Sequence, residues 1–282
     1  NSDGTIDNAN AVIPGAVYHS SLGMYSVRTQ GIAAKNLSDT VYFKIYLRLS
    51  DGSYLYTKQM KYSPITYANN ILAGSQHSTE MKTLVVAMLN YGAAAQVYFD
   101  YKADQLMNAH LTEAQLALVE PYRSDMIDPV VYADKEKAGG FPSTEDGFIR
   151  KSASISFEGA FSIQYYYQPS TTVSGKVQFY YWTSTTYQAV EYLTADNADG
   201  IMTMTGEGIL QAKVTGIAAK NLDDTVYVAA IYSDGSALYC SGVSAYSIGQ
   251  YCLNKASIES DIQPLAAATA VYGYYAKALL LK

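Results

Sequence analysis

A twelve-residue sequence that occurs twice is the feature that most constrains the fold of this 282-residue chain. Residues 31–42 read GIAAKNLSDTVY, and residues 216–227, which lie 185 positions further along, read GIAAKNLDDTVY. The same offset aligns Gly23 with Gly208. Agreement over this length indicates an internal duplication, so we expect the chain to fold as two related units.

The strand that opens the repeated unit can be recognised from its alternation. Residues 41–49 read VYFKIYLRL, with Val, Phe, Ile and Leu at one set of alternate positions and Tyr, Lys, Tyr and Arg at the other. This pattern is typical of a half-buried strand. The turn residues SDG follow at 50–52. A three-residue turn with Gly52 left-handed is favoured over a two-residue Asp-Gly turn, because only the longer turn keeps the two faces unmixed.

This register predicts a hairpin with one tyrosine face and one aliphatic face. Arg48 then pairs with Tyr54, and Tyr46 pairs with Tyr56, while Leu55 stays with the aliphatic side chains. The second copy is expected to follow the same division. Its outer residues would be Tyr227 and Tyr239, and its inner residues would be Val228, Ala230 and Leu238.

Each copy ends in a helical pattern, at residues 78–101 in the first and at about 262–281 in the second. We therefore expect a mainly β protein with helices, built from two duplicated β-sandwich-like lobes that are each followed by a packed α-helix. Residues 1–132 would form the first lobe and residues 151–282 the second lobe. The charged stretch at 133–150, which contains Gly and Pro, would be the linker between them.

The most aromatic part of the chain has no counterpart in the first copy. It occupies residues 153–185, whereas extending the constant offset back to Asn1 reaches only Thr186. We therefore expect the chain to begin inside its first lobe, through the choice of the expressed region or through proteolysis. A genuinely shorter first lobe is the alternative.

Composition narrows the possible functions. The chain has 28 Tyr but only 7 Phe and 1 Trp, and its formal net charge is −6. The acidic balance argues against nucleic-acid binding, and the lack of an apolar run near twenty residues argues against membrane insertion. Sheets rich in tyrosine suit sugars instead, because an aromatic ring can stack on the C–H face of a pyranose.

The sequence lacks the patterns that mark common catalytic sites, so we expect a protein that binds rather than an enzyme. It contains no nucleophile elbow, zinc-protease motif or phosphate loop, and its three histidines are scattered. Glycoside hydrolysis needs two carboxylates about 5 to 9.5 Å apart, and nothing pairs acidic residues such as Glu158 and Glu191 specifically. We expect no cofactor and no metal, since there is no Cys-x-x-Cys pair or histidine cluster.

A strand in the second copy, at residues 177–182, holds most of the candidate binding residues. If its odd positions point inward, its even positions point outward and offer rings for stacking and an amide for hydrogen bonds to hydroxyls. Two tyrosines of the first hairpin join this set. The carbohydrate-binding candidates are Trp182, Tyr180, Gln178, Tyr187, Tyr46 and Tyr54. The alternative for the only tryptophan is that it forms the core of its sandwich.

The two cysteines, Cys240 and Cys252, both lie in the second copy. An even count with this local spacing predicts one disulfide and an oxidising, extracytoplasmic setting. Two buried thiols without a bond are the alternative.

Several stretches resemble a known group of proteins. They are DGTIDNANAVIPGAVY at 3–18, GIAAKNLSDTVYFKIYLRLSDGSY at 31–54, LVVAMLNYGAAAQVYF at 84–99 and SFEGAFSIQYYY at 156–167. The chain is similar over nearly its whole length to the starch-binding modules of the starch adherence system, or amylosome, of gut Firmicutes such as Ruminococcus.

The resemblance implies a non-catalytic carbohydrate-binding module for α-1,4-glucan, meaning starch, amylopectin and maltooligosaccharides, on a bacterial cell surface. The partners that it implies are the α-glucan itself and amylosome scaffold proteins, reached through domains outside this chain. It lies in scaffold motifs, so it transfers no binding residue. The alternative function is a structural or protein-interaction spacer module of a cell-surface protein.

Overall fold

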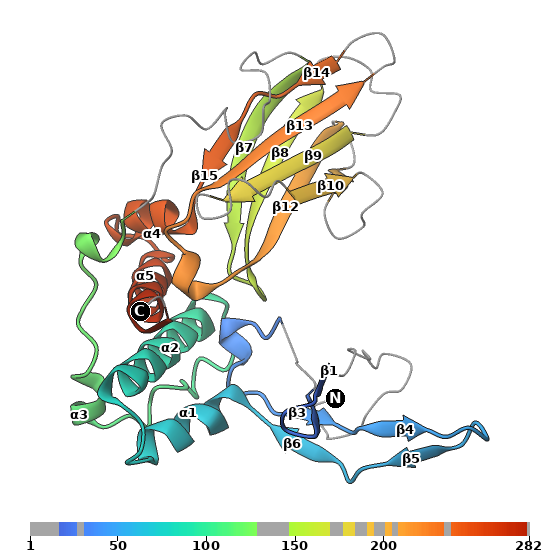
Figure 1. The fold of residues 1–282 in the computed structure, drawn as a ribbon. Coiled ribbons are helices and arrows are strands. Elements are labelled where there is room, and N and C mark those ends of the chain that lie inside the picture. The colour runs from blue at the N-terminus through green and yellow to red at the C-terminus, as the bar shows by residue number, and fades with distance from the viewer. Residues whose placement is uncertain are drawn as a thin grey trace.

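The computed structural model describes residues 17–26, 31–128, 147–169, 177–183, 191–194, 201–204, 208–233 and 238–280. In these parts the chain is a mixed α/β protein with several antiparallel sheets and five α-helices (Figure 1). The predicted linker, residues 133–150, falls largely outside the described ranges, and the domain boundaries stay a prediction.

The C-terminal part contains two antiparallel sheets that pack face to face (Figure 1). One sheet has the order β10-β9-β13-β14, with β15 also paired to β13, and the other has the order β11-β12-β8-β7. The strands are β7 (Phe148–Ser156), β8 (Phe161–Pro169), β9 (Val177–Thr183), β10 (Glu191–Thr194), β11 (Ile201–Met204), β12 (Ile209–Ile217), β13 (Val226–Ser233), β14 (Leu238–Cys240) and β15 (Ser244–Tyr246).

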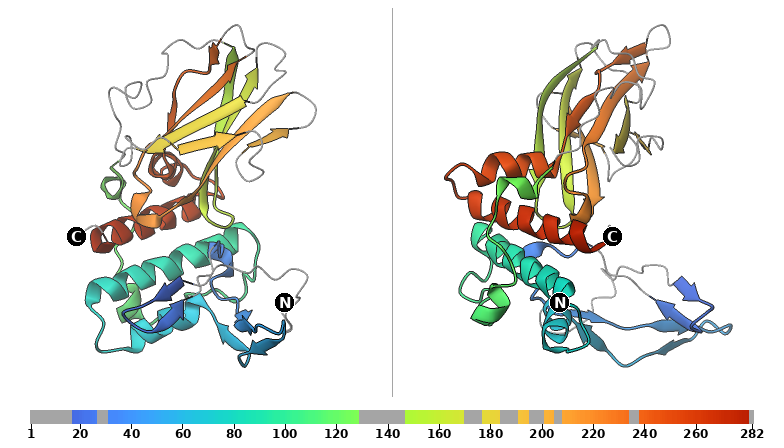
Figure 2. Two further views of the ribbon diagram at one scale, coloured as in Figure 1. Left: turned by 45° about the vertical axis from the view of Figure 1, so that its right-hand side comes forward. Right: turned by 60° about the vertical axis from the view of Figure 1, so that its left-hand side comes forward.

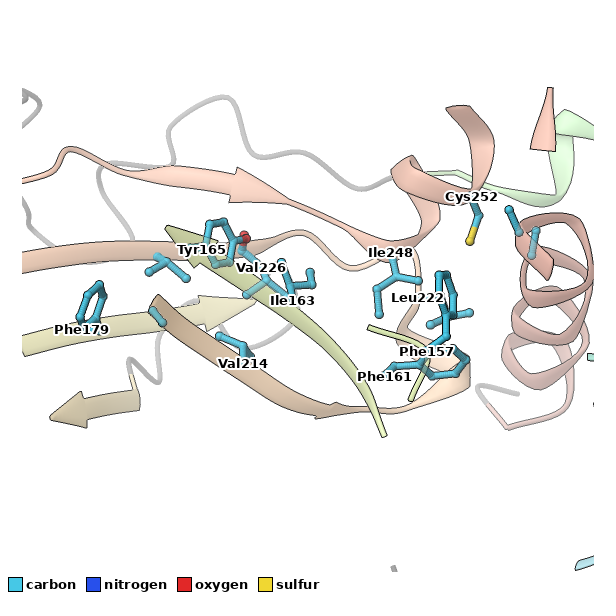
Figure 3. Packing of buried hydrophobic residues seen from close by; sticks show 14 of the residues in the cluster. Phe157, Phe161, Ile163, Tyr165, Phe179, Val214, Leu222, Val226, Ile248 and Cys252 are labelled. Atoms are coloured by element: carbon cyan, nitrogen blue, oxygen red, sulfur yellow. The ribbon is translucent and has the colours of Figure 1, made fainter. Parts of the chain in front are cut away.

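Alternate residues of these strands fill the space between the two sheets. Figure 3 shows Tyr165 and Ile163 of β8 beside Val226 of β13, and Phe179 of β9 belongs to the same cluster. The Tyr165 hydroxyl donates a hydrogen bond of 2.7 Å to the backbone carbonyl of Val226, across the sandwich. A buried hydroxyl needs such a partner, because leaving it unpaired would cost about 1–3 kcal/mol.

The helices are α1 (Pro64–Ala73), α2 (Thr79–Tyr98), α3 (Glu113–Leu116), α4 (Ile248–Ala256) and α5 (Gln263–Leu280). Side-chain caps begin four of these helices: the hydroxyls of Ser63, Ser78 and Ser247 accept backbone N–H groups, and Thr112 forms a capping box with Gln115. Among the described helices, none combines the length and the apolar character needed to cross a membrane.

Helices α2 and α5 pack against each other and join the two parts of the molecule (Figure 1). The rings of Tyr91 on α2 and Tyr272 on α5 stack at a centroid distance of 5.5 Å, with 13° between their planes. Tyr91 also stacks on Phe161 of the sandwich at 5.4 Å. One hydrophobic cluster therefore runs from the helices into the sandwich.

The N-terminal part contains ribbons of two strands. The strands are β1 (Val17–His19), β2 (Met24–Ser26), β3 (Val41–Phe43), β4 (Tyr46–Arg48), β5 (Tyr54–Tyr56) and β6 (Met60–Tyr62). The pairs are β1 with β2, β3 with β6 and β4 with β5. The ribbon made by β3 to β6 extends away from the helices (Figures 1 and 2). Among the described residues, the expected sandwich of two sheets is therefore found only in the C-terminal part.

The repeated sequence takes the same local structure in both places. A 3-10 turn forms at Ala34–Asn36 and again at Ala219–Asn221. Each turn follows a glycine with a positive φ angle, 75° at Gly31 and 80° at Gly216. A side chain at either glycine would be strained, because L residues rarely adopt this backbone conformation.

The predicted register of the first hairpin is confirmed. Tyr46 pairs with Tyr56 and Arg48 pairs with Tyr54, and Gly52 has a φ angle of 84°. The prediction for the second hairpin is wrong at Tyr239. This residue pairs with Tyr232 on β13, and its ring packs against the main hydrophobic cluster instead of lying outside.

The predicted disulfide is not formed. Cys240 on β14 and Cys252 on α4 are both buried without a bond between them. Cys252 belongs to the main hydrophobic cluster (Figure 3). Cys240 lies on β14, where it pairs with Ile231 of β13. Burial, together with the nearby Asp223 carboxylate, raises the pKa of the Cys252 thiol well above its ordinary value, so this thiol behaves as a small apolar side chain.

Candidate functional site

Three tyrosines gather on one face of the β4–β5 ribbon, and we call Tyr46, Tyr54 and Tyr56 the tyrosine triad. They are 39%, 45% and 64% exposed, respectively. Tyr46 and Tyr54 meet in a T-shaped contact with ring centroids 5.3 Å apart, and Tyr56 lies 6.1 Å from each of them. Three rings in mutual contact and open to solvent form a continuous aromatic surface.

A hydrogen-bonded turn connects the two strands that carry this surface. The carboxylate of Asp51 accepts hydrogen bonds from the backbone N–H and the hydroxyl of Ser53, at 2.9 Å and 2.6 Å. The backbone N–H of Leu49 donates to the carbonyl of Ser53 at 2.9 Å, which closes a three-residue turn with Gly52 in the left-handed region. These bonds also keep the pKa of the Asp51 carboxyl below its usual value.

The base of the ribbon is tied to the helices. Ile45 and Thr57 exchange two hydrogen bonds, from Thr57 N to the Ile45 carbonyl at 2.9 Å and from Ile45 N to the Thr57 hydroxyl at 3.1 Å. Beyond β6, Ser63 caps α1, and the backbone N–H of Ile65 bonds the carbonyl of Leu37 at 3.0 Å. The triad therefore projects from a strand pair whose ends are anchored.

The chemistry of the triad suits a ligand rich in hydroxyl groups. Each ring offers an apolar face for C–H groups and a phenolic oxygen that can donate or accept a hydrogen bond. Within residues 41–62 the only acidic residue is Asp51, and its carboxylate is engaged by the turn. This surface can bind and orient a ligand, but by itself it lacks the carboxylate pair that glycoside hydrolysis requires.

The structure contradicts the expected role of Trp182. Its side chain is fully buried at 0% exposure, and its ring stacks on Tyr227 of the neighbouring strand at 5.7 Å with 14° between planes. The predicted alternation is nevertheless correct, because Phe179 of the same strand lies in the main cluster and Trp182 does not. Trp182 fails as a sugar platform because it packs with Val243 and other partly buried residues in a second cluster.

The other residues predicted on β9 do not join the triad. Gln178 and Tyr180 are half-buried, and the Tyr180 hydroxyl donates to the Gln178 amide oxygen at 3.4 Å. Tyr187 lies outside the described residues. Strand β9 belongs to the sandwich, whereas the β4–β5 ribbon lies at the opposite end of the molecule in all views (Figures 1 and 2). The structure therefore unites Tyr46 and Tyr54, and separates both from β9.

Tyr56 is the member of the triad that the candidate set lacks. Its place opposite Tyr46 follows directly from the predicted register, so the signal was present in the turn and the alternation. Directly opposite residues of an antiparallel pair have side chains within reach of each other, which makes Tyr56 a necessary part of any site that includes Tyr46.

A shallow hollow of about 260 Å³ lies between α2, α5 and the segment 119–122. It is lined mainly by apolar groups, with Asn90 and Glu120 at polar positions, and the carboxylate of Glu120 is paired with Arg123. Tyr122 contributes a half-buried ring. This hollow lies in the helix packing and presents no exposed ring face, so the triad is the stronger candidate.

No protein-family model matches the sequence, and no curated protein matches it. Two solved structures are distantly similar to this chain. The bromine derivative of BhCBM56 is 12% identical with a TM-score of 0.25, and the match covers 38% of this chain and 96% of that one. The GH family 64 laminaripentaose-producing β-1,3-glucanase from Paenibacillus barengoltzii, complexed with laminarihexaose, is 14% identical with a TM-score of 0.25, covering 36% of this chain and 20% of that one.

A TM-score of 0.25 is too low to show a common fold. The function must therefore be inferred from the residues of this chain.

Proposed function

We propose that this chain is a non-catalytic carbohydrate-binding module for α-1,4-glucan. The observation that carries the proposal is the exposed tyrosine triad on the β4–β5 ribbon. A glucose ring presents C–H groups on its faces and hydroxyls at its rim, and the three tyrosines offer the matching ring faces and phenolic oxygens.

The tilt of the rings supports a curved ligand. The planes of the triad are inclined to one another by 35° to 73°. A flat, extended glycan would favour coplanar rings, whereas an α-1,4-glucan turns from one glucose to the next and can meet tilted rings in succession. Stacking contacts of about 1–3 kcal/mol each would give roughly millimolar to micromolar affinity for two or three rings.

The wider setting is proposed from the sequence resemblance. The module would be extracellular, on a bacterial surface, and would reach amylosome scaffold proteins through domains outside these residues. The two parts of the chain would descend from one duplicated lobe, which is consistent with the matching turns at Ala34–Asn36 and Ala219–Asn221. Binding of one polymer by more than one module would add avidity.

Affinity electrophoresis tests the proposal. The protein is run in native gels that contain amylopectin, with β-glucan and xylan gels as controls. Retardation by amylopectin alone is the expected result. Equal mobility in all gels, for protein that is shown to be folded by a cooperative unfolding transition, would reject carbohydrate binding of this class.

A second candidate function is a protein-interaction module of a cell-surface protein. It is favoured by the other face of the same ribbon, where Phe43, Ile45 and Leu55 are exposed. The two functions use opposite faces, so each can be tested without the other.

A further inference from the structure

The face of the ribbon opposite the triad is apolar and open to solvent. We call it the apolar ribbon face, and its residues are Val41, Phe43, Ile45, Leu55 and Met60. Phe43, Ile45 and Leu55 are 38%, 42% and 59% exposed. An apolar sheet face of this kind is normally covered, because water around it is unfavourable.

The C-terminal part shows what covers the corresponding strand face there. At the 185-residue offset, Phe43 aligns with Val228 and Ile45 aligns with Ala230. Both of these β13 residues have 0% exposure and belong to the cluster between the two sheets. The same strand position is therefore core in one half and surface in the other.

The pairing of the strand edges also differs between the two parts of the chain. On one edge β13 pairs with β14 and β15, just as β3 and β4 pair with β6 and β5. On its other edge β13 pairs with β9 along the whole stretch from Val226 to Tyr232. Within the described residues, no strand takes the corresponding place beside β3 and β4. Open edges of this kind are templates for adding a strand.

We infer that the edge of β3–β4 that no described strand pairs, together with the apolar ribbon face, forms a docking site for an extended strand of a different polypeptide. The strand adds to the sheet through backbone hydrogen bonds, and its alternate apolar side chains cover Phe43 and Ile45. This inference goes beyond carbohydrate binding, because it concerns a protein ligand on the opposite face.

Charge defines the ligand further. The ribbon, residues 41–62, carries Lys44, Arg48, Lys58 and Lys61 against Asp51, a net charge of +3 within a chain of net charge −6. The alternation puts Lys44 on the tyrosine face, and its pairing with Tyr42 puts Lys61 there too. Acidic residues at the positions between the apolar ones of an added strand would lie beside these two lysines. The ligand is therefore an acidic strand with apolar residues at every second position.

A second copy of this chain is a poorer occupant. The strand that fills the equivalent place, β9, is held in its own sheet between β10 and β13, and Phe179 at its centre has 0% exposure. Releasing β9 to serve a neighbour would open the core of the sandwich, so we assign the site to a different polypeptide.

A labelled peptide tests the inference by fluorescence anisotropy. The probe is EVQFYYWTE, which copies β9, residues 177–183, between two glutamates. The matched control is EVQSYSWTE, in which the two inward aromatic positions become serine. The probe is expected to bind the folded chain, to bind at least about tenfold more tightly than the control, and to weaken as salt rises.

Two protein variants separate this site from the sugar site. Phe43→Lys is expected to reduce probe binding by about tenfold or more and to leave retardation by amylopectin unchanged. Tyr54→Ala is expected to reduce retardation by amylopectin and to leave probe binding unchanged. Both residues are exposed, so neither change should prevent folding, and thermal unfolding of each variant checks this.

Three results would overturn the inference. Equal affinity for the probe and control peptides would show that binding does not depend on the aromatic side chains at alternate positions. Unchanged probe binding by Phe43→Lys would place binding elsewhere. A dimer of the chain alone in light scattering, abolished by Phe43→Lys, would make a second copy the occupant. Loss of amylopectin retardation alone would contradict the proposed function and leave this inference standing.

Discussion

The ring of Tyr54 meets Tyr46 in a T-shaped contact at 5.3 Å and remains almost half exposed. A ligand that stacks on Tyr54 therefore finds a ring that is already oriented by its neighbours. Pre-orientation of this kind lowers the entropy lost on binding. At the scale of single residues, the triad is a small but ordered aromatic surface.

Replacing Tyr54 with alanine is expected to weaken binding of maltoheptaose by about tenfold, because one stacking contact of about 1–3 kcal/mol is lost. Tyr54→Phe keeps the ring and should retain most of the affinity. Isothermal titration calorimetry measures both. The matched control is Tyr67→Ala, an exposed tyrosine on α1 outside the triad, which should bind like the unaltered chain. Equal weakening by both alanine changes would contradict a site at the triad.

Trp182 has a structural role, and its variants should behave accordingly. Trp182→Ala removes a fully buried ring that stacks on Tyr227, so the free energy of unfolding should fall by about 3–5 kcal/mol. Denaturant unfolding measures this loss. The fraction that remains folded should still be retarded by amylopectin. A stable variant that no longer binds amylopectin would show that Trp182 contacts sugar after all.

Buried tyrosines should make the protein sensitive to alkali. Burial raises the pKa of Tyr167 to about 12, although its hydrogen bond to Ser244 partly opposes this. Between its ordinary value near 10 and about 12, the unfolded chain releases a proton that the folded chain retains, so stability falls as pH rises, by up to about 1.4 kcal/mol per pH unit.

Tyr167→Phe should remove the contribution of Tyr167 to the fall of the unfolding free energy between pH 10 and 12. It also removes the hydrogen bond to Ser244, so the variant should be less stable at neutral pH. Urea unfolding at pH 8, 10.5 and 11.5 compares the two proteins. Unfolding free energies that decline in parallel would mean that Tyr167 ionises no later in the folded state than in the unfolded state.

At the scale of elements, close helix packing depends on two glycines that occupy matching places. Gly92 on α2 approaches the carbonyl of Ala34, and Gly273 on α5 approaches the carbonyl of Ala219. A Cβ at Gly273 would lie 3.3 Å from that carbonyl and 2.7 Å from a methyl carbon of buried Leu222. Each 3-10 turn therefore packs against a helix glycine, at a position where a side chain would not fit.

For Gly273→Ala, the direction of the change in stability shows which of two opposing effects is larger. Helix propensity alone would stabilise the protein by about 1 kcal/mol, but overpacking against Leu222 costs about 1–3 kcal/mol. We expect the melting temperature to fall, as measured by circular dichroism. A rise in melting temperature would show that α5 can move away from the turn at Ala219–Asn221 without loss.

The elements that follow from nearby residues could be predicted from the sequence. The hairpin of β4 and β5 is specified by its alternation and by the turn at Gly52, and the helix starts are specified by Ser78 and Thr112. The exposed pair Tyr46 and Tyr54 follows from the same local rules. Such features depend on contacts within about ten residues, which the sequence displays directly.

Features that depend on distant contacts could not be predicted. The burial of Trp182 results from packing with Tyr227 and Val243. The error at Tyr239 is instead a local one of register, because its partner Tyr232 lies seven residues earlier in the same hairpin. Cys252 lies on α4 in the main hydrophobic cluster and Cys240 lies on β14, and the two are unbonded. Local spacing carries no information about which strands and helices will surround a residue.

At the scale of the whole molecule, one hydrophobic cluster joins the sandwich to the helices through Phe161, Tyr91 and Tyr272. The ribbon extends away from this body (Figure 2). A polymer can therefore approach the triad without meeting the sandwich. The rigid part of the molecule supports the ribbon, and the ribbon presents the two faces to which we assign a glycan and a strand.

The most direct test of carbohydrate binding removes the whole surface at once. The triple variant Tyr46→Ala, Tyr54→Ala and Tyr56→Ala is compared with the unaltered chain in native gels over a series of amylopectin concentrations, after unfolding curves have shown that both are folded. We predict that the unaltered chain slows with increasing amylopectin and that the triple variant does not. Equal retardation of the two proteins would contradict the assignment of the triad as the glucan-binding surface.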